Sequence, residues 1–227
     1  MLHKETVEPA TLELLKQLQG ESLLSSFNLV GGTALALKLG HRKSVDLDLF
    51  TSEEFDVEEL KTMLVEKYGM QVSFERGQTL KGFINNVMID CIRFNYNHIQ
   101  TPEEIDGIRI ESIPDIIAMK LSAIAQNGTR IKDFVDIATL SSLYSFEEML
   151  GFYEKKFPHA NIIMIIKAIT FFDDIDFNES VIMTCKKFNW NKIAKRLEDM
   201  VHQPRKKFPK LSEKTQTKVS KGIIKRR

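Results

Sequence analysis

Residues 29–50, with the sequence LVGGTALALKLGHRKSVDLDLF, constrain the fold more than any other part of the chain. Residues 27–30 are typical of a short strand, and they run directly into Gly31 and Gly32. The next residues, 33–39, have a helical pattern. The sequence therefore predicts a strand, a tight turn and a helix in immediate succession.

A second predicted strand, residues 44–50, follows about a dozen positions later, and its polar and apolar residues alternate with period two. The apolar positions are Val45, Leu47 and Leu49. On the other face, Asp46 and Asp48 are two residues apart, so we expect both carboxylates to project from one side. Two adjacent carboxylates repel each other unless a cation lies between them, and their oxygens suit Mg²⁺. We predict that Asp46 and Asp48 hold Mg²⁺, with Mn²⁺ as an alternative ion.

The glycine turn predicts an anion site beside this metal site. Gly31, Gly32 and Thr33 let a ligand approach the backbone closely, and the first N–H groups of the following helix point toward an anion such as a triphosphate. Taken singly, an acid pair on a strand is often solvated surface and a Gly-Gly pair is often an ordinary turn. Their succession within one short stretch is more specific, and it favours a metal and phosphate site.

The remaining pattern predicts an α+β protein with a mixed sheet, flanking helices and a helical C-terminal lobe. Further strands are expected at residues 70–74, 80–84, 86–94 and 108–111, and helices at residues 9–18, 54–68, 116–126, 131–143, 145–157, 161–172 and 191–202. Ser145 and Glu148 have the spacing of a capping box. We expect an α/β lobe over residues 1–111, a helical lobe over residues 112–202 and a basic tail over residues 203–227.

Composition excludes several classes of protein. Of the 227 residues, 43% are hydrophobic and 28% charged, as in soluble globular proteins. Cys91 and Cys185 are too few for a disulfide framework and lack zinc-ligand spacing. We find no apolar run of membrane-spanning length and no basic, apolar start typical of a signal peptide. We therefore expect a cytoplasmic protein without membrane contact. P-loop, GxSxG and HExxH motifs are absent from the sequence.

The C-terminal end is a separate electrostatic feature. Residues 202–227 contain ten Lys or Arg residues against one Glu, a formal charge of +9. Such a segment is most often a mobile, solvated tail. A second interpretation is contact with RNA phosphates through Arg205, Lys206 and Lys207 and through Lys225, Arg226 and Arg227.

The first of these motifs resembles the DNA polymerase beta-like nucleotidyltransferase superfamily, and within it the AbiEii/AbiGii toxin-type nucleotidyltransferases of type IV toxin–antitoxin systems. The matching residues are Gly31-Gly32-Thr33 for an hGG[ST] turn and Arg42-x-Ser44-x-Asp46-Leu47-Asp48-Leu49-Phe50 for an RxSxDhDhF strand. The superfamily also places a third acid on a neighbouring strand, and Asp90 has that setting. A strand-edge acid without a role is the alternative for Asp90.

A second block, residues 113–121 and 128–136, is similar to the family's pxDhhAmKLxAl…RxxKDxxDl signature. Independently, Lys120 shares a helix face with isoleucines and therefore needs a partner. An ion pair with Asp133 or Asp136 would supply it. The resemblance adds a functional interpretation, in which Lys120 neutralises a nucleotide phosphate and Asp133 orients it or acts on the acceptor.

The resemblance implies a Mg²⁺-dependent enzyme that moves a nucleoside monophosphate from an NTP to an acceptor hydroxyl, with release of pyrophosphate. Asp46, Asp48, Asp90, Lys120 and Asp133 would be catalytic. The implied nucleotide-binding residues are Gly31, Gly32, Thr33, Arg42, Ser44, Lys120 and Lys132.

The implied acceptor is an RNA or tRNA 3′ end or a protein, and the implied partner is a cognate antitoxin. An antibiotic-modifying nucleotidyltransferase and a non-catalytic nucleotide- or RNA-binding module remain alternatives. Two further residues are given structural interpretations: we expect His41 to be an exposed loop residue and Trp190 to be a core or lobe-packing aromatic, not a platform for base stacking.

Overall fold

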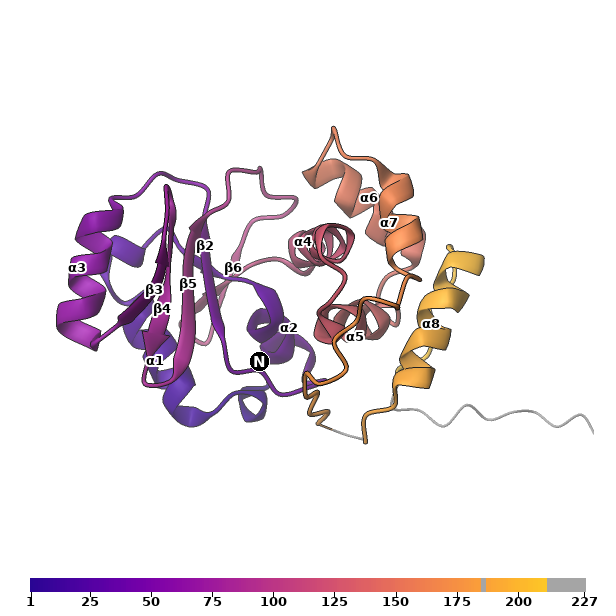
Figure 1. Ribbon diagram of the computed structural model, residues 1–227, viewed down its shortest axis with the longest axis horizontal. Coiled ribbons are helices and arrows are strands. Elements are labelled where there is room, and N and C mark those ends of the chain that lie inside the picture. The colour runs from indigo at the N-terminus through magenta and orange to yellow at the C-terminus, as the bar shows by residue number, and fades with distance from the viewer. Residues whose placement is uncertain (185–186, 212–227) are drawn as a thin grey trace, which may run out of the picture.

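The computed structural model describes residues 1–184 and 187–211 (Figure 1). Its centre is a seven-stranded sheet with the strand order β3-β4-β5-β2-β1-β7-β6. The strands are β1 (Asn28–Leu29), β2 (Leu47–Thr51), β3 (Gln71–Glu75), β4 (Thr79–Ile84), β5 (Val87–Arg93), β6 (Glu103–Ile105) and β7 (Ile108–Ile110). The β2–β5 and β1–β7 pairs are parallel and the others are antiparallel. The predicted mixed sheet is confirmed.

The helices flank this sheet and then form the second half of the molecule. They are α1 (Pro9–Gln19), α2 (Gly31–Leu39), α3 (Val57–Tyr68), α4 (Ile113–Gln126), α5 (Ile131–Leu140), α6 (Phe146–Lys156), α7 (Ile162–Ala168) and α8 (Trp190–His202). In Figure 1, α3 lies on one side of the sheet, while α4 and α5 lie on the other. The predicted α+β class is therefore confirmed.

Local signals set several helix ends. Ser145 and Glu148 form the predicted capping box at the start of α6, each side chain binding the other residue's backbone N–H. Gly40 and Gly69 end α2 and α3 in the left-handed conformation, with φ of 66° at both positions. These capping residues fix where the elements stop, and so fix where the loops beside the site begin.

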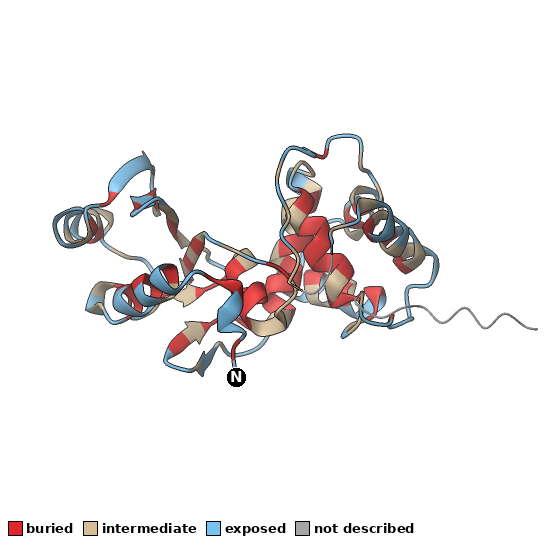
Figure 2. Cartoon of the chain, turned by 90° about the horizontal axis from the view of Figure 1, so that it is seen from below, coloured by how far each residue is buried: buried red, intermediate tan, exposed pale blue. Residues whose placement is uncertain are grey.

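One hydrophobic core extends through both halves of the chain. Buried residues of the sheet, such as Leu47 and Leu49, belong to the same cluster as Ile117 of α4 and Leu197 of α8. Figure 2 shows this buried region running from the sheet into α4 and α5. The predicted division at residue 111 marks the change from strands to helices, and as a domain boundary it stays a prediction.

A segment from the helical half returns to the first half of the chain. Residues 176–184, called the return segment below, pair with the loop after α2: Lys43 N–H donates to Ile182 O at 2.8 Å, and Arg42 forms a β-bridge with Met183. Thr184 N–H donates to His41 O at 3.1 Å. No pattern in the sequence predicts this contact, which brings the return segment to the edge of the candidate site.

Part of the predicted mobile tail is packed against the protein. Phe208 is buried, its N–H donates to Ser141 O at 2.8 Å, and the Arg196 guanidinium lies over its ring. Arg205 pairs with Glu147 on α6. A mobile tail is therefore wrong for residues 203–211, because Phe208 inserts into the helical core. Residues 212–227, with Lys225, Arg226 and Arg227, lie outside the described residues. Among the helices that are described, none has the length and apolar character needed to cross a membrane.

Candidate active site

Two of the predicted acids are neighbours on adjacent parallel strands. Asp48 on β2 is in register with Asp90 on β5, so both side chains leave the same face of the sheet. Burial raises the pKa of Asp48 to about 6, and the charges of Asp90 and Asp46 add to the rise, while Lys120 and Arg130 oppose it. Asp48 is thus a carboxylate whose ionised form is poorly stabilised by the protein alone.

Asp90 has one carboxylate oxygen engaged and one unengaged. Its Oδ2 accepts a hydrogen bond from the Lys81 ammonium on β4. Its Oδ1 is buried and has no hydrogen-bond partner among the described residues. A buried, unpaired carboxylate oxygen is costly, and such an atom beside a second carboxylate suits a cation or a proton donor.

Asp46 reaches the same region from a loop, not from the strand. The predicted strand over residues 44–50 is wrong at its start, because β2 begins at Leu47 and Val45 is 52% exposed. The Thr33 hydroxyl binds the Asp46 carbonyl instead of leaving it free for a strand ladder. Burial raises the pKa of Asp46, and Asp90 and Glu179 add to this effect against Lys132 and Arg130. Asp46 is therefore close enough to interact electrostatically with the Asp48 and Asp90 carboxylates.

The glycine turn touches Asp48 directly. Gly31 has φ of +68°, and a Cβ atom at this position would lie 2.1 Å from Asp48 Oδ2, so no side chain fits. The helix begins at Gly31, two residues earlier than the sequence predicts, because both glycines belong to its first turn. The unpaired N–H groups of that turn therefore open beside the Asp48 carboxylate. The glycine turn therefore lies beside Asp48, and the binding of an anion by this turn stays a prediction.

Thr33 and Ser44 hold the loop that carries Asp46. The Thr33 hydroxyl is buried and lies 2.9 Å from Ser44 Oγ. Both residues are predicted to bind the nucleotide, and the structure places them next to Gly32, where a Cβ atom would lie 3.4 Å from Ser44 Oγ. The two hydroxyls are hydrogen-bonded to each other, and the Thr33 hydroxyl also donates to the Asp46 carbonyl. These bonds hold the loop with Asp46 against the glycine turn.

Arg42 is buried beneath the glycine turn. Its Nε and Nη2 atoms donate to the two oxygens of Asp136 at 2.7 and 2.9 Å. A Cβ atom on Gly32 would lie 2.5 Å from Arg42 Nη2, so the guanidinium supports the turn from below. Burial opposes its charge, but Asp136 raises the pKa of Arg42. The structure thus engages Arg42 with Asp136, and its predicted role as a nucleotide ligand stays a prediction.

His41 corrects another expectation. Its side chain is 6% exposed, and Nε2 lies 2.8 Å from Asp136 Oδ1. His41 is therefore buried instead of exposed, because Asp136 draws it inward and the return segment covers the loop. Its Nδ1 has no hydrogen-bond partner among residues 1–184 and 187–211.

Lys120 has both of the partners that its apolar helix face required. Its Nζ lies 2.5 Å from Asp133 Oδ1 and 3.0 Å from Asp136 Oδ2. Burial opposes the charge, but the two carboxylates raise the pKa of Lys120, so the ammonium is retained. Asp133 Oδ2 is buried without a partner among the described residues. Since the Lys120 charge also acts on Asp48, α4 and α5 bring an ion-pair network up to the sheet acids.

The start of α5 adds two cations beside the site, the exposed Arg130 and the half-buried Lys132. Arg130 precedes the helix, and its charge acts on Asp133, Asp48 and Asp46. Lys132 forms an ion pair with Glu179 of the return segment at 3.0 Å. No motif in the sequence marks Glu179, and it lies more than 130 residues from Asp46, the acid whose pKa it raises.

A second acidic cluster lies near the start of α4. His98, Glu111 and Asp115 have ligand atoms within 4.8 Å of one another, the one such group of three found in the described part of the chain. Asp115, however, already binds the Lys156 ammonium at 2.6 Å, the Ser112 hydroxyl at 2.6 Å and two backbone N–H groups. Lys156 thus takes the place of a cation there, and the cluster is a less suitable metal site than the sheet acids.

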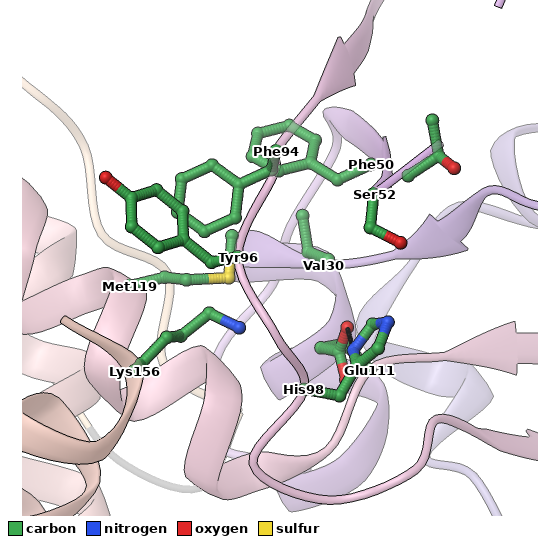
Figure 3. Close-up of a pocket in the computed structure, with 10 residues that line it drawn as sticks. Val30, Phe50, Ser52, Phe94, Tyr96, His98, Glu111, Met119 and Lys156 are labelled. Atoms are coloured by element: carbon green, nitrogen blue, oxygen red, sulfur yellow. Dashed lines mark ion pairs between the residues drawn. The ribbon is translucent and has the colours of Figure 1, made fainter. Parts of the chain in front are cut away.

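A small pocket lies beside the second cluster, and His98 and Glu111 form part of its wall (Figure 3). Its wall includes Val30, Phe50 and Met119. Val30 precedes the glycine turn, Phe50 lies on the same face of β2 as Asp48, and Met119 precedes Lys120. Phe94 and Tyr96 lie across from Lys156 in Figure 3. The pocket therefore lies between the second cluster and the aromatic loop after β5, and it has room for about one water molecule; Asp46, Asp48 and Asp90 are not among the residues that line it.

Trp190 packs as predicted. Its ring meets those of Phe172 and Phe177 edge to face, with centroid distances of 5.3 and 5.4 Å. It also contacts Phe134 of α5 at 6.2 Å. The interpretation of Trp190 as a core aromatic is confirmed.

Comparisons with known proteins agree with this geometry. The profile of the AbiEii family, described as nucleotidyl transferase AbiEii toxin of type IV toxin–antitoxin systems, matches residues 13–106 and 89–214. An uncharacterized protein of Aquifex aeolicus is 29% identical over an alignment of 168 residues, and this alignment covers 71% of this chain and 81% of that protein.

Two solved structures share the fold. MenT4, a nucleotidyltransferase toxin from Mycobacterium tuberculosis, is 15% identical and superposes with a TM-score of 0.56 over 84% of this chain and 81% of its own. JHP933 from Helicobacter pylori is also 15% identical, with a TM-score of 0.52 over 88% of this chain and 93% of its own. With a profile that matches nearly the whole described chain, this protein belongs to the AbiEii family of nucleotidyl transferase toxins of type IV toxin–antitoxin systems.

Proposed function

We propose that this protein moves a nucleoside monophosphate from an NTP to an acceptor hydroxyl and releases pyrophosphate. One observation carries the proposal: Asp48 lies between Asp90, its neighbour on β5, and Gly31, at the open N-terminus of α2. Metal-binding acids and an anion-binding helix end are thereby in contact. This combination suits phosphoryl chemistry, in which positioning and electrostatic stabilisation supply most of the catalysis.

The acids fit a divalent cation. Asp46 and Asp48 offer hard oxygen ligands, burial raises the pKa of both, and the unpaired Oδ1 of Asp90 lies on the same face. We assign Asp46 and Asp48 as the ligands of Mg²⁺ or Mn²⁺. When bound, such an ion neutralises triphosphate charge and polarises the phosphorus that is attacked.

The surrounding groups bind the phosphates. In the proposal, the N–H groups of Gly31, Gly32 and Thr33 receive phosphate oxygens, as a helix N-terminus favours. Arg130 and Lys132 approach from the start of α5. Lys120 contributes positive charge from beneath, held in place by Asp133 and Asp136 when no nucleotide is bound.

Arg42 and Ser44 act through the loop that they stabilise. Arg42 holds the Gly32 backbone from below, and Ser44 binds Thr33, so each keeps the phosphate-binding turn in shape. In the proposal Arg42 is a positioning residue whose anchor is Asp136.

Asp90 is the proposed base. Its Oδ2 is held by Lys81, while its free Oδ1 accepts the proton of the acceptor hydroxyl as the new bond to phosphorus forms. The displaced oxygen leaves with pyrophosphate. In this arrangement Asp133, with its unpaired Oδ2, orients Lys120 toward the nucleotide.

The proposed acceptor is the 3′ end of an RNA such as tRNA, the proposed partner is a cognate antitoxin, and the proposed location is the cytoplasm. Family membership supports the antitoxin. The basic residues Lys206 and Lys207, exposed beside α6 and α8, support contact with RNA.

The test is incubation of the purified protein with each α-labelled NTP, Mg²⁺ and total RNA. Asp48→Asn should abolish the transfer of label. Asp106→Asn is the matched control, because Asp106 is an acid in a turn with φ of 55°, a conformation that asparagine accepts, and it pairs with Lys4 away from the site. Transfer that persists in Asp48→Asn would remove the proposed site. Label transferred only to small hydroxylated compounds would favour the antibiotic-modifying alternative, and nucleotide binding without transfer would favour the non-catalytic one.

A further inference from the structure

A row of residues crosses four strands from the edge of the sheet to the candidate active site. Phe74 on β3 is in register with Lys81 on β4, Lys81 with Asp90 on β5, and Asp90 with Asp48 on β2. Residues in register across a sheet share a face. Phe74 therefore lies on the same face as the proposed base, two strand spacings or roughly 10 Å from it.

A second aromatic ring lies beside this row. Phe83, two residues along β4 from Lys81, shares its face and is in register with Met88. Phe74 is 47% exposed and Phe83 42% exposed. The other face of β4, with Leu80 and Ile84, is buried, and α3 packs against β4. The face that carries these rings is therefore the open one, and β3 beside it is exposed along its whole length. We call this surface, formed by Phe74, Lys81, Phe83 and Met88, the aromatic face.

Its charges suit an anionic chain. By the strand register, Lys81 and Asp90 are the charged residues that β3, β4 and β5 present on this side, while Glu75 lies on the other side, where it pairs with Lys61. Lys81 is in register with Phe74 and two residues from Phe83, and its ammonium lies at Asp90. Exposed aromatic rings beside a cation are the combination that single-stranded nucleic acids bind: bases stack on rings, and phosphates meet cations.

We propose that the aromatic face binds the single-stranded end of a nucleic-acid acceptor, with bases stacked on Phe74 and Phe83, a phosphate near Lys81 and the terminal hydroxyl at Asp90. The inference rests on the proposed function, whose acceptor it specifies as a flexible, unpaired strand. The continuity of the row supports the proposal. If the terminal hydroxyl of a nucleic acid reaches Asp90, the preceding nucleotides must either lie across this face or turn directly away from the sheet.

The test measures RNA binding without nucleotide or metal, so that it is independent of catalysis. The probe is a fluorescein-labelled single-stranded RNA of about ten nucleotides with a free 3′ hydroxyl, followed by anisotropy. Phe74→Ala and Phe83→Ala should each weaken binding by about 5- to 100-fold. Val72→Ala is the matched control: Val72 lies on the same strand with 40% exposure, but its register with Gly82 places it on the opposite face, and its removal should leave the affinity unchanged.

Two more variants separate stacking from simple apolar contact. Phe83→Trp should retain RNA affinity, because the ring is kept, whereas Phe83→Leu should lose it even though apolar bulk remains. Thermal unfolding of each variant checks that the fold is intact, which substitution of exposed rings should not affect.

The proposal is overturned if the alanine variants bind RNA as tightly as the wild type, or if Phe83→Leu behaves like Phe83→Trp. Loss of antitoxin binding with unchanged RNA affinity would assign the face to a protein partner and would equally refute it. If the wild type transfers nucleotide to RNA and the acceptor KM is unchanged in both alanine variants, the proposed function stands and this inference fails. If RNA binding falls as expected in the alanine variants but the wild type transfers no nucleotide, this inference stands and the proposed function fails.

Discussion

Replacing Asp136 by asparagine is the sharpest test of how the site is supported. This fully buried carboxylate accepts two hydrogen bonds from Arg42, at 2.7 and 2.9 Å, and one contact from His41 at 2.8 Å, and it pairs with Lys120 at 3.0 Å. Removing one partner of a buried ion pair costs about 3–5 kcal/mol, because the remaining charge stays buried and uncompensated. Asparagine keeps one acceptor oxygen but turns N–H groups toward a cation, so we expect a loss of about 4 kcal/mol.

Urea denaturation measures this loss. With an m-value of about 3 kcal/mol/M, the unfolding midpoint should fall by roughly 1.3 M. Glu54→Gln is the matched control, since it makes the same change of acid to amide in the Arg93–Glu54 pair, where the Glu54 side chain is 75% exposed. That variant should lose at most about 1 kcal/mol. A loss below about 1 kcal/mol for Asp136→Asn, or an equal loss in both variants, would refute the argument from the buried network.

The same substitution predicts a pH effect. Burial acts to raise the pKa of Asp136, but Arg42 and Lys120 hold it well below its ordinary value. A lowered folded-state pKa adds stability that is present above the unfolded value, near 3.9, and is lost as the pH falls through the folded value. The wild type should therefore lose stability steeply below pH 4, and this slope should be smaller in Asp136→Asn. Equal slopes in acid titrations of the two proteins would contradict the assignment.

Three further perturbations probe the site itself. Asp48→Asn should stabilise the metal-free protein at pH 8 by up to about 3 kcal/mol, since the pKa of Asp48 is raised from 3.8 to about 6 and each pKa unit corresponds to about 1.4 kcal/mol. The gain should be close to zero at pH 3.5, where Asp48 is mostly protonated in both the folded and unfolded states; thermal midpoints at pH 8 and pH 3.5 decide this. Gly31→Ala should destabilise the protein by at least about 1–3 kcal/mol, because of φ of +68° and the 2.1 Å approach to Asp48 Oδ2; an unchanged urea midpoint would count against the close packing of the turn. Glu179→Gln should tighten NTP binding about two- to fivefold by calorimetry, since it releases Lys132, whereas weaker binding would instead favour a direct role for Glu179 with the metal.

Local patterns predicted the parts of the site that lie close together in the sequence. The glycine turn and the acid pair belong to one strand–helix–strand unit, whose order is set by turn chemistry and alternation, and Ser145 with Glu148 predicted a helix start from side-chain capping alone. The error at Asp46 has the same local origin. The alternation of polar and apolar residues includes Val45, but the Thr33 hydroxyl donates a hydrogen bond to the Asp46 carbonyl, and β2 begins only at Leu47.

Contacts between distant residues were out of reach. The Arg42–Asp136 pair joins residues 94 positions apart, and nothing in the spacing of either residue selects the other. His41 looked exposed because it follows a helix-ending glycine, and only the covering return segment and Asp136 bury it. Glu179 was missed for the same reason. A single sequence shows which residues are charged, but the tertiary structure determines which of them form ion pairs.

The return segment also bears on the order of events during synthesis. The loop after α2 completes its backbone pairing only with Ile182, Met183 and Thr184, about 140 positions downstream. A nascent chain emerging from the ribosome at about 5–20 residues per second thus exposes Asp46, Asp48 and the glycine turn at least several seconds before the return segment is synthesised. Fragments that end before the return segment would contain the glycine turn and the acid pair but lack the backbone pairing that completes the loop after α2.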